Sequence, residues 1–470
     1  HKPDRRQRQM CIRDRIYIPK KIMTSKRKQF AKTPISIFFS DDQVPKKFKD
    51  TSFEEFDSYS VLKTEEAILI NLKKISNLNT LQKNHRLLLI GLAIRKFVKS
   101  GNFFIEYFGC KKTDKKNFFI GWHLAEYSFD KFKSKKKTKK NNAKIHFESS
   151  SEIKSISESY FYVRDLINTP ANILGPKEIY NSAKKYLKKF DMVNLKSGKS
   201  LENNFPLISA VGIGASANRQ PIFCEFKSKT KYKKKIVLIG KGVSFDTGGL
   251  NIKTGTGMSL MKKDMGGAAN CIGLAKLFSD VGIQVDLHLL LCLVENSISK
   301  KSMRPSDIVK SREGSFVEIG DTDAEGRLIL ADAITYASES KPDLIVDMAT
   351  LTGASRVAMG LEVPSFFCND DDLAMKLIDS SKRTGDPLWQ LPLWDNYSNQ
   401  LNSEHADFKN IGNSVFGGAI TAALFLQKFV KNTPWIHIDL MAWTRANKYS
   451  SYEGGEAMGI RALLDFFKRF

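Results

Sequence analysis

The stretch KKIVLIGKGVSFD at residues 234–246 is apolar through most of its length and ends in a glycine-containing loop and an acid. A run of this length, rich in Val and Ile, is typical of a strand that is buried on both faces of a sheet. Three later segments have the same character: QVDLHLLLCLVEN (284–296), PDLIVDMATLTGA (342–354) and WIHIDLMAW (435–443). We therefore predict that these segments are strands of one buried sheet.

Segments with helical character alternate with these strands. They are GGAANCIGLAKLFSD (266–280), GRLILADAITYASES (326–340) and GGAITAALFLQKFV (417–430). This alternation predicts an α/β fold with a central, mostly parallel sheet that helices cover on both faces. Ligands of such sheets bind beyond the carboxyl ends of the strands. The polar residues of these segments gather at those ends, so the topology also predicts where the functional site lies.

Four carboxylates fall at these strand ends and in the loops that follow them: Asp246, Asp264, Asp323 and Glu325. Glycine or other small residues flank them, which lets the backbone and ligands come close. Four acids held together beside an apolar sheet cannot all stay ionised without cations. Carboxylates are natural ligands of divalent metal ions. We therefore predict that two such ions bind at this edge of the sheet.

Each acid taken singly has a simpler interpretation, because a lone acid in a turn is most often a helix cap or a surface group. The combination is more specific than its parts. Lys241 and Lys253 bracket the first acid, and Arg327 follows the last one. Cys and His are absent from these segments, which argues against a structural zinc site.

The same segments closely resemble the leucyl aminopeptidase (cytosol aminopeptidase) family of two-metal metallopeptidases, in a bacterial branch. The order and spacing of the matching segments make the resemblance specific. They are VRDLINTPAN (163–172), GKGVSFDTGGLNIK (240–253), MKKDMGGAA (261–269), DTDAEGRLILADA (321–333) and ATLTGA (349–354). The resemblance covers the part of the chain after residue 150, and the N-terminal third matches weakly.

The resemblance implies a metallo-aminopeptidase that releases N-terminal residues, leucine-like ones preferentially, from peptides. It implies two divalent metal ions per subunit, Mn or Zn. The implied ligands are Lys241, through a neutral amine, and the four acids. In the family pattern Asp246 and Glu325 bridge both ions. Asp264 holds the tighter ion and Asp323 the more exchangeable one.

Lys253 and Arg327 are the catalytic residues that the resemblance implies. Lys253 stabilises the developing oxyanion. Arg327 holds a bicarbonate ion, whose planar shape a guanidinium fork suits, and the bicarbonate acts as general base toward the attacking water. The free amine of the substrate binds one metal ion. That requirement explains why such an enzyme spares internal peptide bonds.

The pocket for the first side chain is implied to consist of Met261, Thr350 and Gly353. Leu351 is implied to offer its carbonyl oxygen to the substrate amine. An apolar wall containing Met suits Leu or Met side chains, although Met is also a common filler of protein cores. Two departures from the family leave substrate preference open. The family segment that corresponds to DTDAEGRL (321–328) usually begins with Asn, and here that residue is Asp321. Residues 437–466 also differ from the best-known members.

The N-terminal third carries no catalytic pattern. ISIFFS (35–40) predicts a strand by its β-branched and aromatic content. Residues 83–100 have apolar positions at helical spacing, and NFFIGWHL (117–124) favours another strand. The Lys-rich run at 131–144 is typical of a solvated linker, with a contact to nucleic acid as the alternative.

We predict four parts along the chain. Residues 1–22 form a non-native or disordered extension, 23–148 an N-terminal α/β domain, 149–175 a linker helix and loop, and 176–470 the catalytic domain. The first fifteen residues contain five arginines and show no periodicity. An organelle presequence is the alternative interpretation of this end.

The chain has a formal net charge of +25, with lysines spread along its whole length. A lysine-biased background explains this charge, and an electrostatic surface for nucleic acid is the alternative. The second hypothesis for function is therefore a nucleic-acid-binding or regulatory protein built on an aminopeptidase scaffold. An inactive structural member is excluded at this level, because every implied ligand and both catalytic residues are present.

The cysteines stand singly, in mostly apolar surroundings and without CxxC spacing. They are Cys11, Cys110, Cys224, Cys271, Cys292 and Cys368. This usage indicates reduced, mostly buried thiols and a cytoplasmic protein. The best candidate for a membrane span, 287–294, is too short to cross a membrane and is predicted to be a buried strand. By analogy with the family, we expect a homo-hexamer that acts on peptides.

Overall fold

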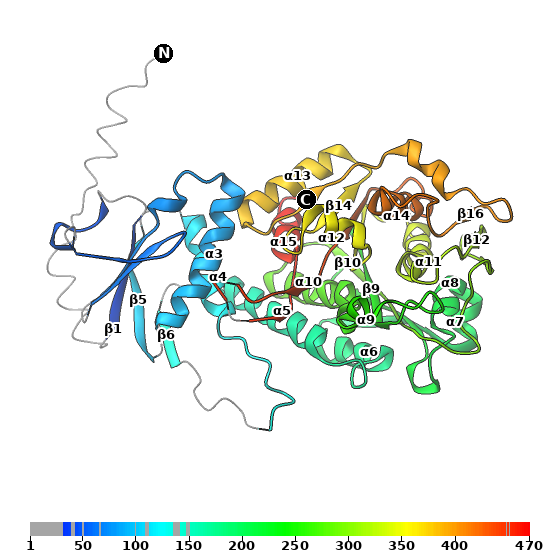
Figure 1. The fold of residues 1–470 in the computed structure, drawn as a ribbon, viewed down its shortest axis with the longest axis horizontal. Helices are drawn as coiled ribbons and strands as arrows, with labels where there is room; N and C mark the ends of the chain where they lie inside the picture. The colour runs from blue at the N-terminus through cyan, green and yellow to red at the C-terminus, as the bar shows by residue number, and fades with distance from the viewer. Residues whose placement is uncertain are drawn as a thin grey trace, which may run out of the picture. The chain divides into compact units, whose positions relative to one another are not determined.

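The computed structural model describes two compact units (Figure 1). The described residues are 32–38, 43–48, 51–64, 67–98, 100–108, 112–134, 142–146, 151–447, 449–450 and 452–470. The smaller unit comprises His1–Ser76, Arg95–Cys110 and Thr138–Glu148. The larger unit comprises Asn77–Ile94, Lys111–Lys137 and Ser149–Phe470. The predicted extension at 1–22 lies outside the described residues.

The smaller unit contains a six-stranded sheet in the order β2-β3-β4-β1-β5-β6. Its strands are β1 Lys32–Phe38, β2 Glu54–Glu55, β3 Ser60–Lys63, β4 Ile68–Asn71, β5 Ser100–Phe108 and β6 Asn142–His146; short 3-10 turns are η2 Lys46–Phe48 and η3 Lys73–Ile75. Strand β1 pairs in parallel with β4 and β5, and its Ile35 and Ile37 are fully buried. The strand predicted at 35–40 is confirmed as far as residue 38, and the last two positions lie outside the described residues.

Helices α3 (Thr80–Phe97) and α4 (Lys112–Leu124) follow strands of the smaller unit in sequence, but residues 77–94 and 111–137 group with the larger unit. The helix predicted within 83–100 is confirmed by α3. The Lys-rich run is described only in part: residues 131–134 are exposed, and 142–144 lie in β6.

The strand predicted at 117–124 is wrong, because these residues form the second half of α4. Phe118, Phe119 and Ile120 are consecutive and all buried. A Cβ on Gly121 would lie 1.9 Å from the carbonyl oxygen of Leu88, so the backbones of α3 and α4 are in direct contact. A helix that neighbours cover on several sides loses the polar positions that reveal its period. For this reason the sequence pattern of 117–124 resembled that of a buried strand.

The larger unit is built on an eight-stranded sheet in the order β15-β14-β17-β13-β9-β10-β8-β7. Its strands are β7 Phe190–Ser197, β8 Ile222–Ser228, β9 Lys235–Asp246, β10 Asp286–Asn296, β13 Leu344–Ala349, β14 Ser365–Cys368, β15 Trp389–Gln390 and β17 Trp435–Asp439. The four central strands, β17, β13, β9 and β10, are parallel, as the four apolar segments predicted. The pairs β14–β17, β10–β8 and β8–β7 are antiparallel. The α/β prediction is confirmed, with antiparallel pairs added on both sides.

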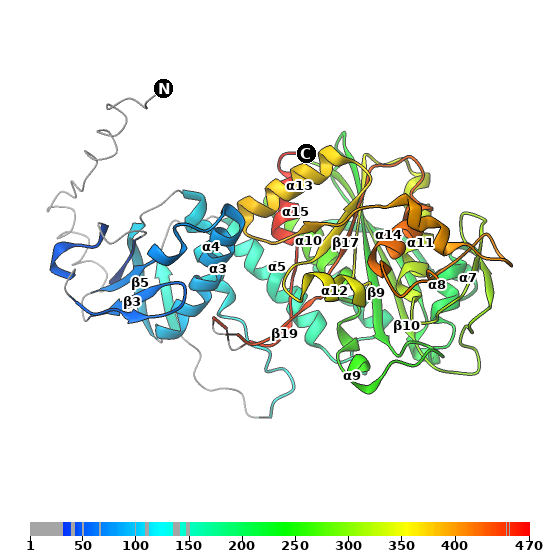
Figure 2. The ribbon, with the colours of Figure 1, turned by 45° about the horizontal axis from the view of Figure 1, so that its top comes forward.

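Helices cover both faces of this sheet (Figure 2). The helices of the larger unit after residue 150 are α5 Ser151–Asn168, α6 Pro176–Tyr186, α7 Gly198–Asn204, α8 Pro206–Gly212, α9 Gly255–Met258, α10 Gly266–Val281, α11 Glu325–Glu339, α12 Gly353–Met359, α13 Asp371–Thr384, α14 Gly418–Gln427 and α15 Ile460–Phe467. Helix α10 packs on β9, α5 and α15, whereas α11 packs on β9, α8 and α14. The remaining elements are β11 Ile308–Lys310, β12 Phe316–Glu318, β16 Phe408–Lys409, β18 Trp443–Thr444, β19 Gly454–Gly455, η4 Ala217–Arg219, η5 Met261–Lys263 and η6 Asp395–Leu401.

Strand β9 lies between these two layers, and its side chains alternate between them. Val237 and Ile239 belong to the hydrophobic cluster that contains α11. Gly240 lies on the opposite face, where an added Cβ would come within 2.5 Å of the Cα of Ala268 in α10. Alternation therefore directs Lys241, the next residue, toward α11. Among the described residues, no helix has both the length and the apolar character needed to cross a membrane.

We predict that Gly121→Ala destabilises the larger unit, because its new methyl group would collide with the backbone of α3. Overpacking of this kind costs about 1–3 kcal/mol, so the midpoint of thermal unfolding should fall. Gly255→Ala is the matched control, since a Cβ there meets open space. Equal midpoints for the two variants would contradict the close contact of α3 and α4.

Candidate metal centre

The predicted ligands come from four places at one end of the central sheet. Lys241 and Asp246 lie in β9, and Asp246 is its last residue. Asp264 follows the short turn η5 and lies two residues before the start of α10. Asp323 lies in the loop before α11, and Glu325 is the first residue of that helix. The carboxyl end of β9 and the amino ends of α10 and α11 thus meet, as the topology predicted.

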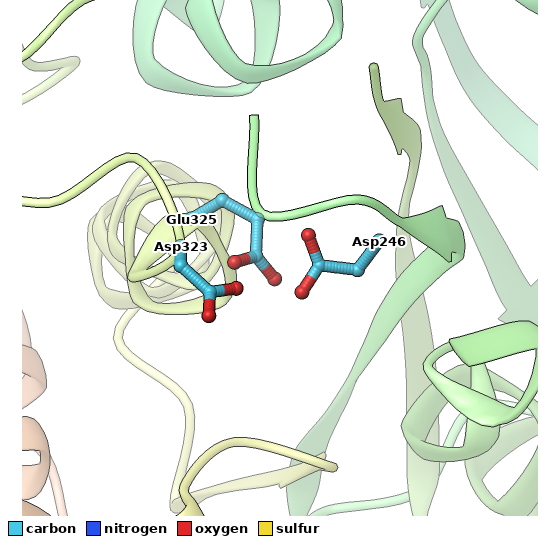
Figure 3. Close-up of side chains that lie close together, drawn as sticks. All are labelled: Asp246, Asp323 and Glu325. Carbon is cyan, nitrogen blue, oxygen red and sulfur yellow. The ribbon is translucent and has the colours of Figure 1, made fainter. Parts of the chain in front are cut away.

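Three of the carboxylates converge on one point. Asp246, Asp323 and Glu325 each offer an oxygen atom, and these atoms lie within 4.8 Å of one another (Figure 3). Burial and the charge of Asp246 raise the pKa of Asp323 to about 7 and that of Glu325 to about 8. Such shifts mean that the negative charges lack sufficient compensation. A divalent cation would provide it, so this donor set fits a metal ion.

Two lysine ammonium groups lie among these acids. Lys241 Nζ lies 2.8 Å from Asp264 Oδ2 and 3.0 Å from Glu325 Oε1. Lys253 Nζ lies 2.9 Å from Asp246 Oδ2 and also pairs with Asp323. Although burial opposes the charge, the paired acids hold the pKa of both lysines above its usual value. Each ammonium therefore occupies a position between two carboxylates where a cation is favourable.

Backbone and amide groups fix Asp246. Its Oδ1 accepts hydrogen bonds from the backbone N–H of Gly248 and from Asn296 Nδ2, both at 2.8 Å. Asn296 is the last residue of β10 and pairs in register with Asp246. Thr322 joins the loops, because its hydroxyl donates to the Gly248 carbonyl at 2.6 Å and accepts from the Asn251 N–H at 2.8 Å. Asn296 and Thr322 were not identified as site residues from the sequence. Asn296 could have been found, because it lies at the end of a predicted strand, as Asp246 does.

Asp321, the departure from the family pattern, holds the loop that carries Asp323. Its Oδ1 accepts a hydrogen bond from the backbone N–H of Asp323 at 2.8 Å. The amide of Asn410 donates to the backbone carbonyl of Asp321 at 2.8 Å and so supports the same loop. Arg327 Nη1 donates to the carbonyl of Asn410, also at 2.8 Å. Burial lowers the pKa of Arg327 to about 10.

A cavity of about 640 Å³ opens beside these groups. Every site residue predicted from the sequence lines it, namely Lys241, Asp246, Lys253, Met261, Asp264, Asp323, Glu325, Arg327, Thr350, Leu351 and Gly353. Thr350 touches the ligand group directly, because its hydroxyl donates to Asp264 Oδ1 at 2.7 Å and its carbonyl accepts from Lys241 at 3.0 Å. The described chain thus brings all of these predicted residues around one cavity.

Two cationic residues that sequence reasoning did not single out also line the cavity, Lys263 and Arg356. Lys263 is 2% exposed, and burial lowers its pKa to about 7. The sequence offered one indication that Lys263 could belong to the site, because in the segment MKKD it directly precedes the predicted ligand Asp264. Nothing in the sequence showed whether its side chain points to solvent or inward.

Comparisons with known proteins agree with this geometry. A family model described as cytosol aminopeptidase family, catalytic domain, matches residues 161–464. A probable cytosol aminopeptidase from Persephonella marina is 40% identical over 360 residues, 73% of this chain and 72% of that protein. These names do not favour the alternative of a nucleic-acid-binding protein on this scaffold.

Two solved structures are similar over nearly the whole chain. The crystal structure of a cytosol aminopeptidase from Coxiella burnetii has a TM-score of 0.83 and 36% identity, covering 93% of this chain and 97% of that one. The bottromycin maturation enzyme BotP in complex with Mn has a TM-score of 0.80 and 26% identity, covering 93% and 99%.

The raised pKa values of Asp323 and Glu325 predict how pH affects the metal-free protein. Between about pH 5 and 7 the folded protein retains protons that the unfolded chain has released, so stability should fall as the pH rises. Each group contributes at most about 1.4 kcal/mol per pH unit. Burial also raises the pKa of Asp332 to about 7, so Asp332 contributes to the same fall in stability. Thermal unfolding of chelator-treated protein at several pH values measures this slope.

Glu325→Gln isolates one of these groups, because the amide keeps the shape of the side chain and does not titrate. It should make the slope shallower, whereas Glu313→Gln, at an exposed position, should leave the slope as it is. The same slope in both variants would show that Glu325 ionises as an ordinary carboxyl group.

Proposed function

Because the chain belongs to the cytosol aminopeptidase family, it is a metallo-aminopeptidase that acts on peptides, and we propose that two divalent ions support its reaction. The ligands that we assign are Lys241, Asp246, Asp264, Asp323 and Glu325. Bound divalent ions of this kind polarise the scissile carbonyl and lower the pKa of a water molecule. The oxygen-rich donor set suits Mn or Zn, and a Mn complex is known for the similar enzyme BotP.

One observation carries the assignment of two ions. The acids form two pairs, Asp264 with Glu325 and Asp246 with Asp323, and one lysine ammonium lies between the members of each pair. The side chain of Lys241 is 3% exposed and that of Lys253 is 16% exposed, so solvent screens the charges of the first pair less than those of the second. Two separate positions thus favour positive charge. We assign one ion to the neighbourhood of each pair.

Lys241 and Lys253 have different fates in this proposal. Lys241 is enclosed by Asp264, Glu325 and the Thr350 carbonyl, so it can contact an ion at this place only as a neutral amine. Release of its proton turns an ammonium group into a ligand. Lys253 is more accessible, with 16% of its side chain exposed. Because metal ions held by Asp246 and Asp323 would compensate those acids, the Lys253 ammonium would be available to stabilise the oxyanion that forms on the substrate.

We assign Arg327 as the residue that holds bicarbonate. Its guanidinium lines the cavity, is 8% exposed, and uses Nη1 to bind the carbonyl of Asn410. That bond orients the planar fork and leaves further N–H groups for a planar anion. We assign bicarbonate as the general base that accepts a proton from the attacking water. Asp321 is a positioning residue in this scheme, because it holds the backbone of Asp323.

The substrate enters through the cavity. Met261, Thr350 and Gly353 are assigned to the pocket for the first side chain, where the Met261 wall suits leucine-like residues. The backbone N–H of Leu351 donates to Asp439 at 2.9 Å, which fixes the peptide unit before it. We assign the carbonyl of Leu351 as the acceptor for the free amine of the substrate. Recognition of that amine restricts cleavage to the first peptide bond.

Hydrolysis of leucine p-nitroanilide tests the two-metal proposal. Activity should depend on added Mn²⁺ or Zn²⁺, disappear after chelation, and fall at least about a hundredfold in Asp323→Ala, because losing a ligand exceeds the effect of losing a group that only orients one. Asp379→Ala removes an exposed acid of α13 and is the matched control. Activity that survives both chelation and Asp323→Ala would refute the mechanism.

We also propose a cytoplasmic homo-hexamer. Cytoplasmic location is supported by the names of the relatives and by four buried free thiols, Cys224, Cys271, Cys292 and Cys368. The hexamer is supported by analogy with the family. Light scattering should give six times the subunit mass of 53.1 kDa. A monomeric mass at micromolar concentration would contradict this assembly.

A further inference from the structure

Lys263 is a buried basic residue next to the predicted ligand Asp264. It is 2% exposed, and its Nζ has no hydrogen-bond partner among the described residues. Taking an ammonium group out of water costs several kcal/mol unless an opposite charge and hydrogen bonds replace the water. The side chain nevertheless lies in the wall of the cavity and not in the apolar core.

The two carboxylates whose charges act on Lys263 are occupied elsewhere. Asp264 pairs with Lys241 and accepts from the hydroxyl of Thr350. Asp439 accepts from the backbone N–H of Leu351 and from both the N–H and the hydroxyl of Thr352. Both influence Lys263 through space, but neither provides the direct partner that a buried ammonium requires.

Arg356 is a second basic residue with an unsatisfied donor, although the residue as a whole is partly exposed. It lies in α12, lines the same cavity, and has a buried Nη1 with no hydrogen-bond partner in the described part of the chain. Its positive charge repels a positive charge on Lys263. Two neighbouring cations with unused donors at one cavity wall are a binding site for an anion, because an anion offsets both charges and satisfies both donors.

The positions of these cations indicate which part of a substrate they meet. Lys263 follows Met261 by two residues in η5, and Arg356 follows Gly353 by one turn of α12. A Cβ on Gly353 would lie 3.8 Å from Arg356 Nη2. Met261 and Gly353 are the residues assigned above to the pocket for the first side chain. The two cations therefore lie next to that pocket.

We propose that Lys263 and Arg356 form an anion subsite that binds the side-chain carboxylate of an N-terminal glutamate or aspartate. This inference rests on the proposed function and extends the substrate class from leucine-like residues to acidic ones. The methylene groups of glutamate lie against Met261, and its carboxylate receives hydrogen bonds from Lys263 Nζ and Arg356 Nη1. Glutamine has the same shape but no charge, so the subsite discriminates against it.

The test compares glutamate and glutamine p-nitroanilides on Mn-loaded protein at constant bicarbonate, with the leucine compound as reference. We expect kcat/KM to be at least about tenfold higher for glutamate than for glutamine, and this ratio to fall at least about tenfold in Lys263→Met. Arg356→Met should lower the ratio too, and its partly exposed position makes misfolding less of a concern. A wild-type ratio of one or less would overturn the proposal.

Lys262→Met is the matched control, because Lys262 is the adjacent lysine but donates to the carbonyl of Asn168 and does not line the cavity. Its glutamate-to-glutamine ratio should equal that of the wild type. A second pair of substrates, Leu-Gly and Leu-glycinamide, tests whether the subsite binds the C-terminal main-chain carboxylate of a dipeptide instead. A preference for free Leu-Gly that Lys263→Met abolishes would assign the subsite to the main-chain carboxylate and overturn the side-chain assignment.

Direct binding separates this inference from the proposed function. If the Mn-loaded protein hydrolyses no leucine substrate, the proposed function fails, and calorimetric titration with glutamate and glutamine still decides the subsite. Tighter binding of glutamate that Lys263→Met weakens at least about tenfold supports the subsite. Equal affinities for the two amino acids overturn it.

Discussion

Mutual repulsion among four acids, three of them buried and Asp323 partly exposed, is the constraint on which the rest of this structure depends. Asp246, Asp264, Asp323 and Glu325 lie at one end of a sheet that excludes water from its interior. Buried charges require partners, and two lysines provide them in the metal-free chain. Hydrogen bonds from the surrounding loops hold Asp246 and Asp323 in place, where a divalent cation would be favourable.

The backbone meets this need through close packing at β9. Gly240 lets α10 approach one face of the strand, and the next residue, Lys241, faces α11. On that side, a Cβ on Gly326 would lie 2.6 Å from the Lys241 side chain. Two helices thus bring their amino ends to the same strand. Gly248 and Gly249 follow with positive φ angles of 87° and 64° and turn the chain back beside Asp246.

Much of this arrangement could be predicted from the sequence, because apolar strands and the acids at their ends are local patterns. The helix at 112–124 could not, since close contact with α3 removed the polar positions that mark a helical period. The inward direction of Lys263 could not either, because a lysine is usually solvated and only three-dimensional packing buries it. The role of Asp321 also needed the structure, which shows its hydrogen bond to the loop of Asp323.

Thr350 has two roles in the proposed site. Its hydroxyl donates to Asp264 and its carbonyl accepts from Lys241, and we propose that it also borders the space for the first side chain of a peptide. A substitution of Thr350 that changes the preference for the first side chain is therefore expected to change the affinity for metal ions as well. During divergence within the family, substitutions that change substrate preference are expected at cavity residues that form no hydrogen bond with the predicted metal ligands. Lys263 and Arg356 are two such residues.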